Sequence, residues 1–211
     1  GRDWTRRRKA GRVGLIGRNG AGKSTLLRKI SAATPRVADY PFTTTEPMLG
    51  LVRHHDCDVV VADLPGLIEG AHAGRGLGHR FLRHLSRTRI LVFLLPIDGE
   101  LEPPAALEAL RKELEAHDPA LLERDFILCL SRVDLSRSYE IDDERMREWR
   151  EALGSTRRGL EALALSGLTG DGVPALLDAL VDLLRPLGEV RAAGEGEGDP
   201  GDGSYDPLAG R

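Results

Sequence analysis

The chain has 211 residues, of which 41% are hydrophobic and 30% charged, and its formal net charge is −3. This length suits one domain with a full hydrophobic core. The slightly negative net charge argues against binding to nucleic acid through overall charge alone. Two cysteines are too few for a disulfide framework, and no apolar run is long enough to span a membrane. We therefore expect a cytoplasmic monomer with no membrane partner.

Charged residues are unevenly distributed along the chain. Residues 1–11 form a basic lead-in, whereas residues 189–211 are rich in glycine and acidic residues and contain almost nothing to bury. We predict that this tail is disordered and that residues 12–188 form the folded domain. The basic run at 6–9 offers a surface for RNA phosphates, although a solvated lead-in to the first strand is the simpler interpretation.

Strand-like and helix-like patterns alternate from residue 12 onward. In chain order we predict a strand at 12–17, a helix at 23–33, strands at 47–53 and 57–63 joined by a polar turn at 54–56, a helix at 78–88, a strand at 89–97, a helix at 103–117, a strand at 125–130, a helix at 142–153, a strand at 160–165 and a helix at 173–184. This alternation predicts an α/β fold: a mainly parallel sheet with one antiparallel edge pair and helices on both faces.

The first strand leads into the pattern G-x-x-x-x-G-K-S, which is typical of a P-loop NTPase. Its glycines let the backbone N–H groups point at phosphates, and the start of the next helix adds a positive end. Lys23 is placed to reach the β- and γ-phosphate oxygens, and the Ser24 hydroxyl to ligate Mg²⁺. The predicted cofactor-binding residues of this loop are Gly17, Arg18, Asn19, Gly20, Ala21, Gly22, Lys23, Ser24 and Thr25.

A second motif, Asp63-Leu64-Pro65-Gly66, ends the apolar strand at 57–63. Ligands bind at the carboxyl ends of strands in open α/β sheets, so Asp63 is expected to hold Mg²⁺ through a water. Gly66 leaves a backbone N–H free near a γ-phosphate.

Together with the phosphate loop, the stretches "ADYPFTTTEPMLGLV" (38–52) and "DLPGLIEGAHAGRGLGHRFLRHLSRTRILV" (63–92) resemble the G domain of Obg-type GTPases over residues 12–185. The resemblance implies a GTPase with a threonine that ligates Mg²⁺ when GTP is bound. By motif position this is Thr44, in the segment Phe42-Thr43-Thr44, with Thr43 and Thr45 as rivals. With Lys23 and Gly66 from the motifs above, the predicted catalytic residues are Lys23, Thr44 and Gly66. The resemblance also implies a role with the large ribosomal subunit or its RNA.

The guanine-recognition motif of that family, Asn-Lys-x-Asp, corresponds here to Ser131-Arg132-Val133-Asp134. A carboxylate at Asp134 accepts two hydrogen bonds from guanine, and adenine offers no such donor pair. Arg132 can lie flat along the base, whereas Ser131 lacks the amide that would tie this loop to its neighbours. The last family motif falls at Ser166, Gly167 and Leu168, whose backbone groups are expected to touch the base.

Three functional hypotheses remain. The leading one is a switch that binds Mg-GTP and hydrolyses it slowly in ribosome assembly or translation-related control. The second is a nucleotide-binding interaction module without turnover, because the guanine motif is altered and the phosphate loop has Gly20 where Obg-like loops usually carry Asn. The third is an ATP-using P-loop protein. A transport-type ATPase is disfavoured because Asp63 follows Lys23 too closely and is followed by Leu64.

Overall fold

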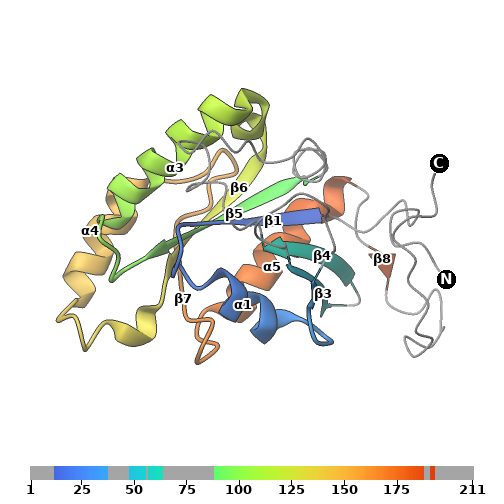
Figure 1. Ribbon diagram of the computed structural model, residues 1–211, viewed down its shortest axis with the longest axis horizontal. Helices are drawn as coiled ribbons and strands as arrows, with labels where there is room; N and C mark the ends of the chain where they lie inside the picture. The colour runs from blue at the N-terminus through green and yellow to red at the C-terminus, as the bar shows by residue number, and fades with distance from the viewer. Residues whose placement is uncertain (1–11, 38–47, 56, 64–87, 188–190, 193–211) are drawn as a thin grey trace.

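A computed structural model of the chain describes residues 12–37, 48–55, 57–63, 88–187 and 191–192. Within them, the strands form one sheet with the order β2-β3-β4-β1-β5-β6-β7 (Figure 1). These strands are β1 (Arg12–Ile16), β2 (Arg36–Val37), β3 (Met48–His54), β4 (Cys57–Asp63), β5 (Ile90–Pro96), β6 (Asp125–Ser131) and β7 (Leu163–Leu165).

The strands β4, β1, β5, β6 and β7 run parallel, and β3 pairs antiparallel with β4. The predicted α/β fold is therefore confirmed. β5 and β6 are apolar along nearly their whole length because helices cover both faces of the sheet. β3 and β4 instead form a hairpin, whose turn begins at His55 with a φ of 44°. The turn is one residue shorter than predicted, because His54 still pairs with Cys57.

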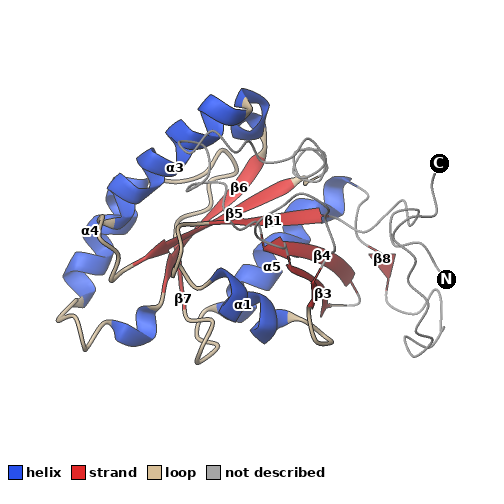
Figure 2. Cartoon of the chain, viewed as in Figure 1, coloured by secondary structure: helices blue, strands red, loops and turns tan. Residues whose placement is uncertain are grey.

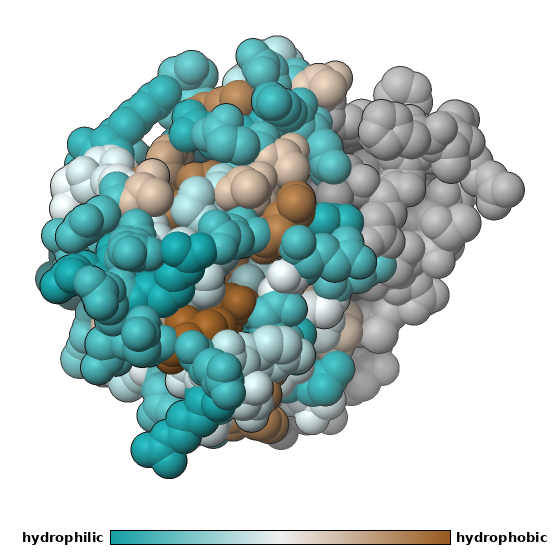
Figure 3. Space-filling view, turned by 90° about the vertical axis from the view of Figure 1, so that its left-hand side faces the viewer, coloured by the Kyte–Doolittle hydropathy of each residue, from teal (hydrophilic) through white to brown (hydrophobic). Residues whose placement is uncertain are grey.

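The helices cover the two faces of the sheet (Figure 2). α1 (Lys23–Ile30) and α5 (Val173–Leu184) pack on one face through Leu26, Leu27 and a stripe of α5 leucines. α3 (Pro103–His117) packs on the other face through Leu107, Leu110 and Leu114. α4 (Asp143–Leu153) inserts only Trp149 fully into a smaller cluster beside β6. The surface on this side of the molecule is accordingly mostly hydrophilic (Figure 3).

Two elements are each three residues shorter than predicted. The helix expected to reach residue 33 ends at Ile30, because Ser31 is extended and its hydroxyl donates to the Leu27 carbonyl at 2.6 Å. The strand expected over 160–165 is only β7, since the chain before it closes a turn in which the Leu160 N–H bonds the Thr156 hydroxyl at 3.2 Å. Short-range side-chain bonds of this kind compete with regular structure.

Several 3₁₀ turns and short strands were not predicted. The turns are η2 (Pro119–Glu123), η3 (Val133–Leu135) and η4 (Arg185–Leu187), and β2 pairs with β3. β8 (Arg191–Ala192) pairs antiparallel with the start of β4. The sheet thus takes in two residues that we had placed in the disordered tail, because the first residues of β4 extend beyond the start of β1 and leave an edge to pair with. The lead-in at 1–11, the helix at 78–88 and the rest of the tail lie outside the described residues.

Cys57 and Cys129 are buried and free. Cys129 lies in the middle of β6, and burial raises the pKa of its thiol, which therefore stays protonated and unreactive. None of the helices in the described part of the chain has the length and apolarity needed to cross a bilayer.

Candidate nucleotide-binding site

The predicted site residues in the described chain gather at the carboxyl edge of the sheet. β1 runs into the phosphate loop at 17–22, β4 ends at Asp63, β6 ends at Ser131 and β7 leads to Ser166. Because these strands are parallel, segments distant in the sequence meet at this one edge. This edge is where ligands bind in open α/β sheets.

The start of α1 has no side-chain cap. Gly22, in the left-handed conformation with φ 91°, caps the helix without a side-chain hydrogen bond, and the first turn contains no acid. The other described helices differ: α3 and α5 have proline at the first positions, which removes N–H donors, and Asp142 caps α4. The first N–H groups of a helix point along its axis and the helix dipole places its positive end there, so an uncapped start suits α1 to phosphate binding.

Lys23 is held inside the phosphate loop. Its side chain is buried, and its ammonium nitrogen donates to the carbonyl oxygens of Gly17 at 2.7 Å and Arg18 at 3.0 Å. A buried ammonium keeps more of its electrostatic strength than an exposed one. The two backbone bonds thus fix a positive charge directly beside the donors of α1.

Ser24 and Asp63 form the second part of the site. The Ser24 hydroxyl donates to Asp63 Oδ2 at 2.5 Å, which joins the first turn of α1 to the end of β4. The Asp63 side chain is buried, and among the described residues its Oδ1 has no hydrogen-bond partner. A buried carboxylate oxygen without a partner is costly. Hydroxyl and carboxylate oxygens are the ligands that Mg²⁺ prefers, so this pair fits a magnesium site.

The loop at the end of β6 lies against the phosphate loop. The buried Ser131 hydroxyl donates to the Ala21 carbonyl at 3.0 Å. This corrects the expectation that serine leaves the loop untied: the hydroxyl keeps one bond, because β6 ends close enough to the phosphate loop for the short side chain to reach it.

Replacing Ser131 with Ala should therefore loosen the phosphate loop. We expect a loss of about 1–3 kcal/mol in the free energy of unfolding, because the Ala21 carbonyl would lose a buried bond, and faster dissociation of bound GDP. Urea denaturation and stopped-flow release of fluorescent GDP measure the two effects. The exposed Ser138 offers a matched Ser138→Ala control. Unchanged dissociation in Ser131→Ala would contradict the role of this bond.

Arg132 bridges two parts of the site. It adopts the left-handed conformation with φ 65°, one guanidinium nitrogen pairs with Asp98 at 3.0 Å, and another donates to the Gly20 carbonyl at 3.3 Å. Sequence reasoning had overlooked Asp98. Its carboxylate is buried and follows β5, so the rule that selected Asp63, an acid just after a buried strand, would also have selected Asp98.

Asp134 and the loop after β7 complete the edge. Asp134 lies half-buried in η3, and its carboxylate makes no hydrogen bond or ion pair with other described residues. The Ser166 hydroxyl accepts from the backbone N–H groups of Leu168 and Thr169, while Leu168 as a residue is 70% exposed. The acceptor at Asp134 is therefore available to a ligand, and the 166–168 loop has a fixed backbone.

Gly167 brings that loop onto α1. A Cβ at this position would lie 2.8 Å from the Leu26 backbone nitrogen and 2.9 Å from its Cα. The loop therefore rests directly on the helix backbone, one turn beyond the phosphate loop, a distance that only glycine permits.

Thr25 lies exposed in the first turn of α1, and Asn19 in the turn of the phosphate loop. Six predicted site residues fall outside the described residues: Phe42, Thr43, Thr44, Leu64, Pro65 and Gly66. A cleft of about 590 Å³ opens between the loop that precedes α3 and the start of α4, lined by Asp98, Glu102 and Arg145 among others. No phosphate-loop residue lines this cleft, so it is separate from the phosphate site. The phosphate site is identified by its hydrogen bonds instead.

The fold and this edge define the chain as a P-loop NTPase. The family model described as 50S ribosome-binding GTPase matches residues 12–152, and the chain belongs to this family. Solved structures share the fold: the G domain of T. maritima FeoB at a TM-score of 0.57 with 21% identity, covering 82% of this chain and 98% of that one, and Aquifex aeolicus Era at 0.59 with 17% identity, covering 83% and 57%.

Curated relatives named GTPase Obg confirm the resemblance to an Obg-type G domain. The relative from Anaeromyxobacter sp. (strain Fw109-5) is 44% identical over 172 residues, which is 80% of this chain and 47% of that protein. The relative from Desulforudis audaxviator (strain MP104C) is 44% identical over 178 residues, or 83% and 40%. The chain thus spans about half the length of the curated relatives it matches.

Proposed function

We propose that the chain binds Mg²⁺-GTP, hydrolyses it slowly to GDP and phosphate, and acts as a switch in ribosome assembly or translation-related control. The observation that carries the proposal is the bonded pair of Ser24 and Asp63 at the head of an uncapped helix, with one buried carboxylate oxygen left without a described partner. This arrangement suits a triphosphate accompanied by a divalent cation.

Magnesium would be held by Ser24, by Asp63 through water and by Thr44. When bound, it supplies positive charge at the phosphate oxygens. The chain's own groups do the remaining work. The N–H groups of α1 orient the phosphates, and the Lys23 ammonium stabilises the charge that develops as water attacks the γ-phosphate. Gly66 would add a backbone donor at that phosphate.

Preference for guanine rests on Asp134. Its carboxylate is free of other described partners, so it can accept both donors of the guanine edge, and adenine would leave it unpaired. Arg132 would cover the base from the side on which it already contacts the phosphate loop. The backbone of Ser166, Gly167 and Leu168 would line the opposite side.

The ribosomal role has a separate basis. It is supported by the description of the matched family and by the name of the curated relatives. The basic run at 6–9 is a candidate contact for RNA phosphates. Cosedimentation with large ribosomal subunits in the presence of GTP or GDP tests this part of the proposal independently of nucleotide chemistry.

A competition experiment tests the nucleotide part. Fluorescent GDP is bound in the presence of Mg²⁺ and displaced with GTP, GDP or ATP, for the wild type and for Asp134→Ala. We expect GTP and GDP to compete and ATP not to. The substitution should reduce the guanine preference on the order of 10²-fold or more, because each hydrogen bond to a charged group contributes about 1.5–3 kcal/mol.

Asp143→Ala is the matched control, because Asp143 is an exposed acid at the start of α4. It should bind GDP like the wild type. Equal competition by ATP and GTP in the wild type would contradict the guanine preference. Binding without turnover in a subsequent phosphate-release assay would favour the interaction module over the switch.

A further inference from the structure

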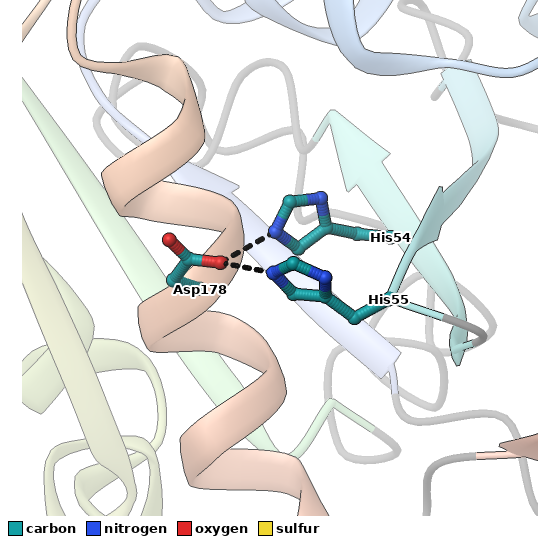
Figure 4. Close-up of side chains that lie close together, drawn as sticks. All are labelled: His54, His55 and Asp178. Carbon is teal, nitrogen blue, oxygen red and sulfur yellow. Dashed lines mark hydrogen bonds and ion pairs between the residues drawn. The ribbon is translucent and has the colours of Figure 1, made fainter.

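Three potential metal ligands converge where the β3–β4 hairpin meets α5, on β-sheet and helix segments that the nucleotide site does not use (Figure 4). The ring nitrogen Nε2 of His54 lies 2.6 Å from Asp178 Oδ1, and Nε2 of His55 lies 2.8 Å from the same oxygen. One ligand atom from each residue lies within 4.8 Å of the other two. We propose that His54, His55 and Asp178 form a binding site for a transition-metal cation of the Zn²⁺ class.

The hairpin turn is what places the two imidazoles side by side. Neighbouring residues of a regular strand point to opposite faces of a sheet. His55, however, has a φ of 44°, a conformation that is uncommon for residues other than glycine. The turn brings its ring to within 4.0 Å of the His54 ring, centroid to centroid. Both Nε2 atoms consequently face Asp178 from one side, as Figure 4 shows.

The cluster is charged and open to solvent. Hydrogen bonds from His54 and then His55 hold the pKa of Asp178 below its ordinary value, so its carboxylate is ionised at neutral pH. The Asp178 side chain is 54% exposed and that of His55 is 64% exposed. The His54 side chain is only 20% exposed, so a cation would enter from the side of His55 and Asp178.

The ligand set fits zinc better than magnesium. Imidazole nitrogen suits Zn²⁺ and its neighbours in the first transition row, whereas Mg²⁺ selects oxygen ligands. Two nitrogens and one carboxylate oxygen leave a fourth tetrahedral position for water. Around a tetrahedral zinc the ligand atoms stand about 3.3 Å apart. Each Nε2 lies 2.6 or 2.8 Å from Asp178 Oδ1, so each ring needs to move away from that oxygen by roughly 0.5–0.7 Å.

Metal binding would replace the two hydrogen bonds. Each ring binds as neutral imidazole, and the hydrogen on Nε2 moves to Nδ1 or to solvent. The metal would then join the hairpin to α5. Two nearby groups lie outside the cluster: Cys57, which pairs with His54 across the hairpin and is buried, and Asp182, one turn further along α5.

Zinc titration of the metal-free full chain tests the site. Calorimetry and thermal unfolding are recorded with Zn²⁺ in the presence of excess Mg²⁺, which occupies oxygen sites. The variants are His55→Ala and Asp178→Asn. The matched controls are His117→Ala, which removes a histidine elsewhere, and Asp182→Asn, which removes a neighbouring acid on the same helix. Co²⁺ in place of Zn²⁺ adds an absorption spectrum that reports tetrahedral nitrogen and oxygen ligation.

We expect one zinc per chain, a higher unfolding temperature with zinc, and a tetrahedral cobalt spectrum. His55→Ala and Asp178→Asn should lose at least about tenfold in zinc affinity, since even indirect contacts to a metal contribute that much, while both controls keep it. GDP binding in all variants reports that they are folded. Absence of saturable zinc binding in the wild type would overturn the proposal. Wild-type zinc affinity in His55→Ala and Asp178→Asn would also overturn it.

Discussion

Lys23→Ala is expected to abolish detectable binding of Mg²⁺-nucleotide while the chain stays folded. The buried ammonium is the one cation held inside the loop by two backbone carbonyls in the described part of the site. Without it, the loop would lose its buried full charge, and the phosphates would depend on Mg²⁺ and on the partial charges of α1. The loss of affinity should be on the order of 10²-fold or more, as for removal of a preorganised donor from a charged site.

The measurement is equilibrium titration with fluorescent GDP, alongside circular dichroism to verify folding. Lys29→Ala is the control, because Lys29 lies in the last turn of the same helix and is exposed. It should bind GDP with wild-type affinity. If Lys23→Ala still bound GDP within a few-fold of the wild type, the loop would not be the phosphate site.

Gly172→Ala should be the most destabilising single substitution among the described glycines outside the phosphate loop. Gly172 starts α5 with φ 70°, and a Cβ there would lie 1.9 Å from the Ala164 carbonyl oxygen in β7. The left-handed backbone costs about 1–2 kcal/mol for an L-residue. The clash with strand backbone, which no rotamer change can relieve, should bring the loss to about 4–5 kcal/mol.

Gly159→Ala separates the two contributions. Gly159 has a similar φ of 73°, but nothing lies within 4 Å of a Cβ built there. It should therefore lose only the backbone part, about 1–2 kcal/mol. Chemical denaturation of both variants gives the comparison. Equal losses would mean that the strand and helix separate easily at this point, in contradiction to the tight packing of α5 on β7.

The order of the elements was predictable because it follows from patterns within short windows. Continuous apolar runs identify β5 and β6, and spaced leucines identify α3 and α5. The ends of elements were less predictable, since they depend on single contacts. α1 stops where Ser31 bonds back to Leu27, and β7 is shortened by the Thr156 turn. Neither contact changes the hydrophobic pattern.

The site was predictable in its residues but not in its internal bonds. Spacing alone identified Lys23, Ser24 and Asp63, because a strand, loop and helix fix their order along the chain. The bridge from Arg132 to Asp98 joins residues from two different strand ends. The bond from Ser131 to Ala21 spans 110 positions. Pairing of this kind depends on which strands become neighbours, and no local pattern encodes that.

The contact at Gly167 sets the dimensions of the site. The loop expected to meet the base is stacked on the backbone of the helix that starts at the phosphate loop, with Leu26 only 2.8 Å from the position of a missing Cβ. A contact between two backbone segments cannot be relieved by rotating a side chain. The loop expected to meet the base and the phosphate loop are thus held at a constant separation, which fixes the length of ligand that can span them.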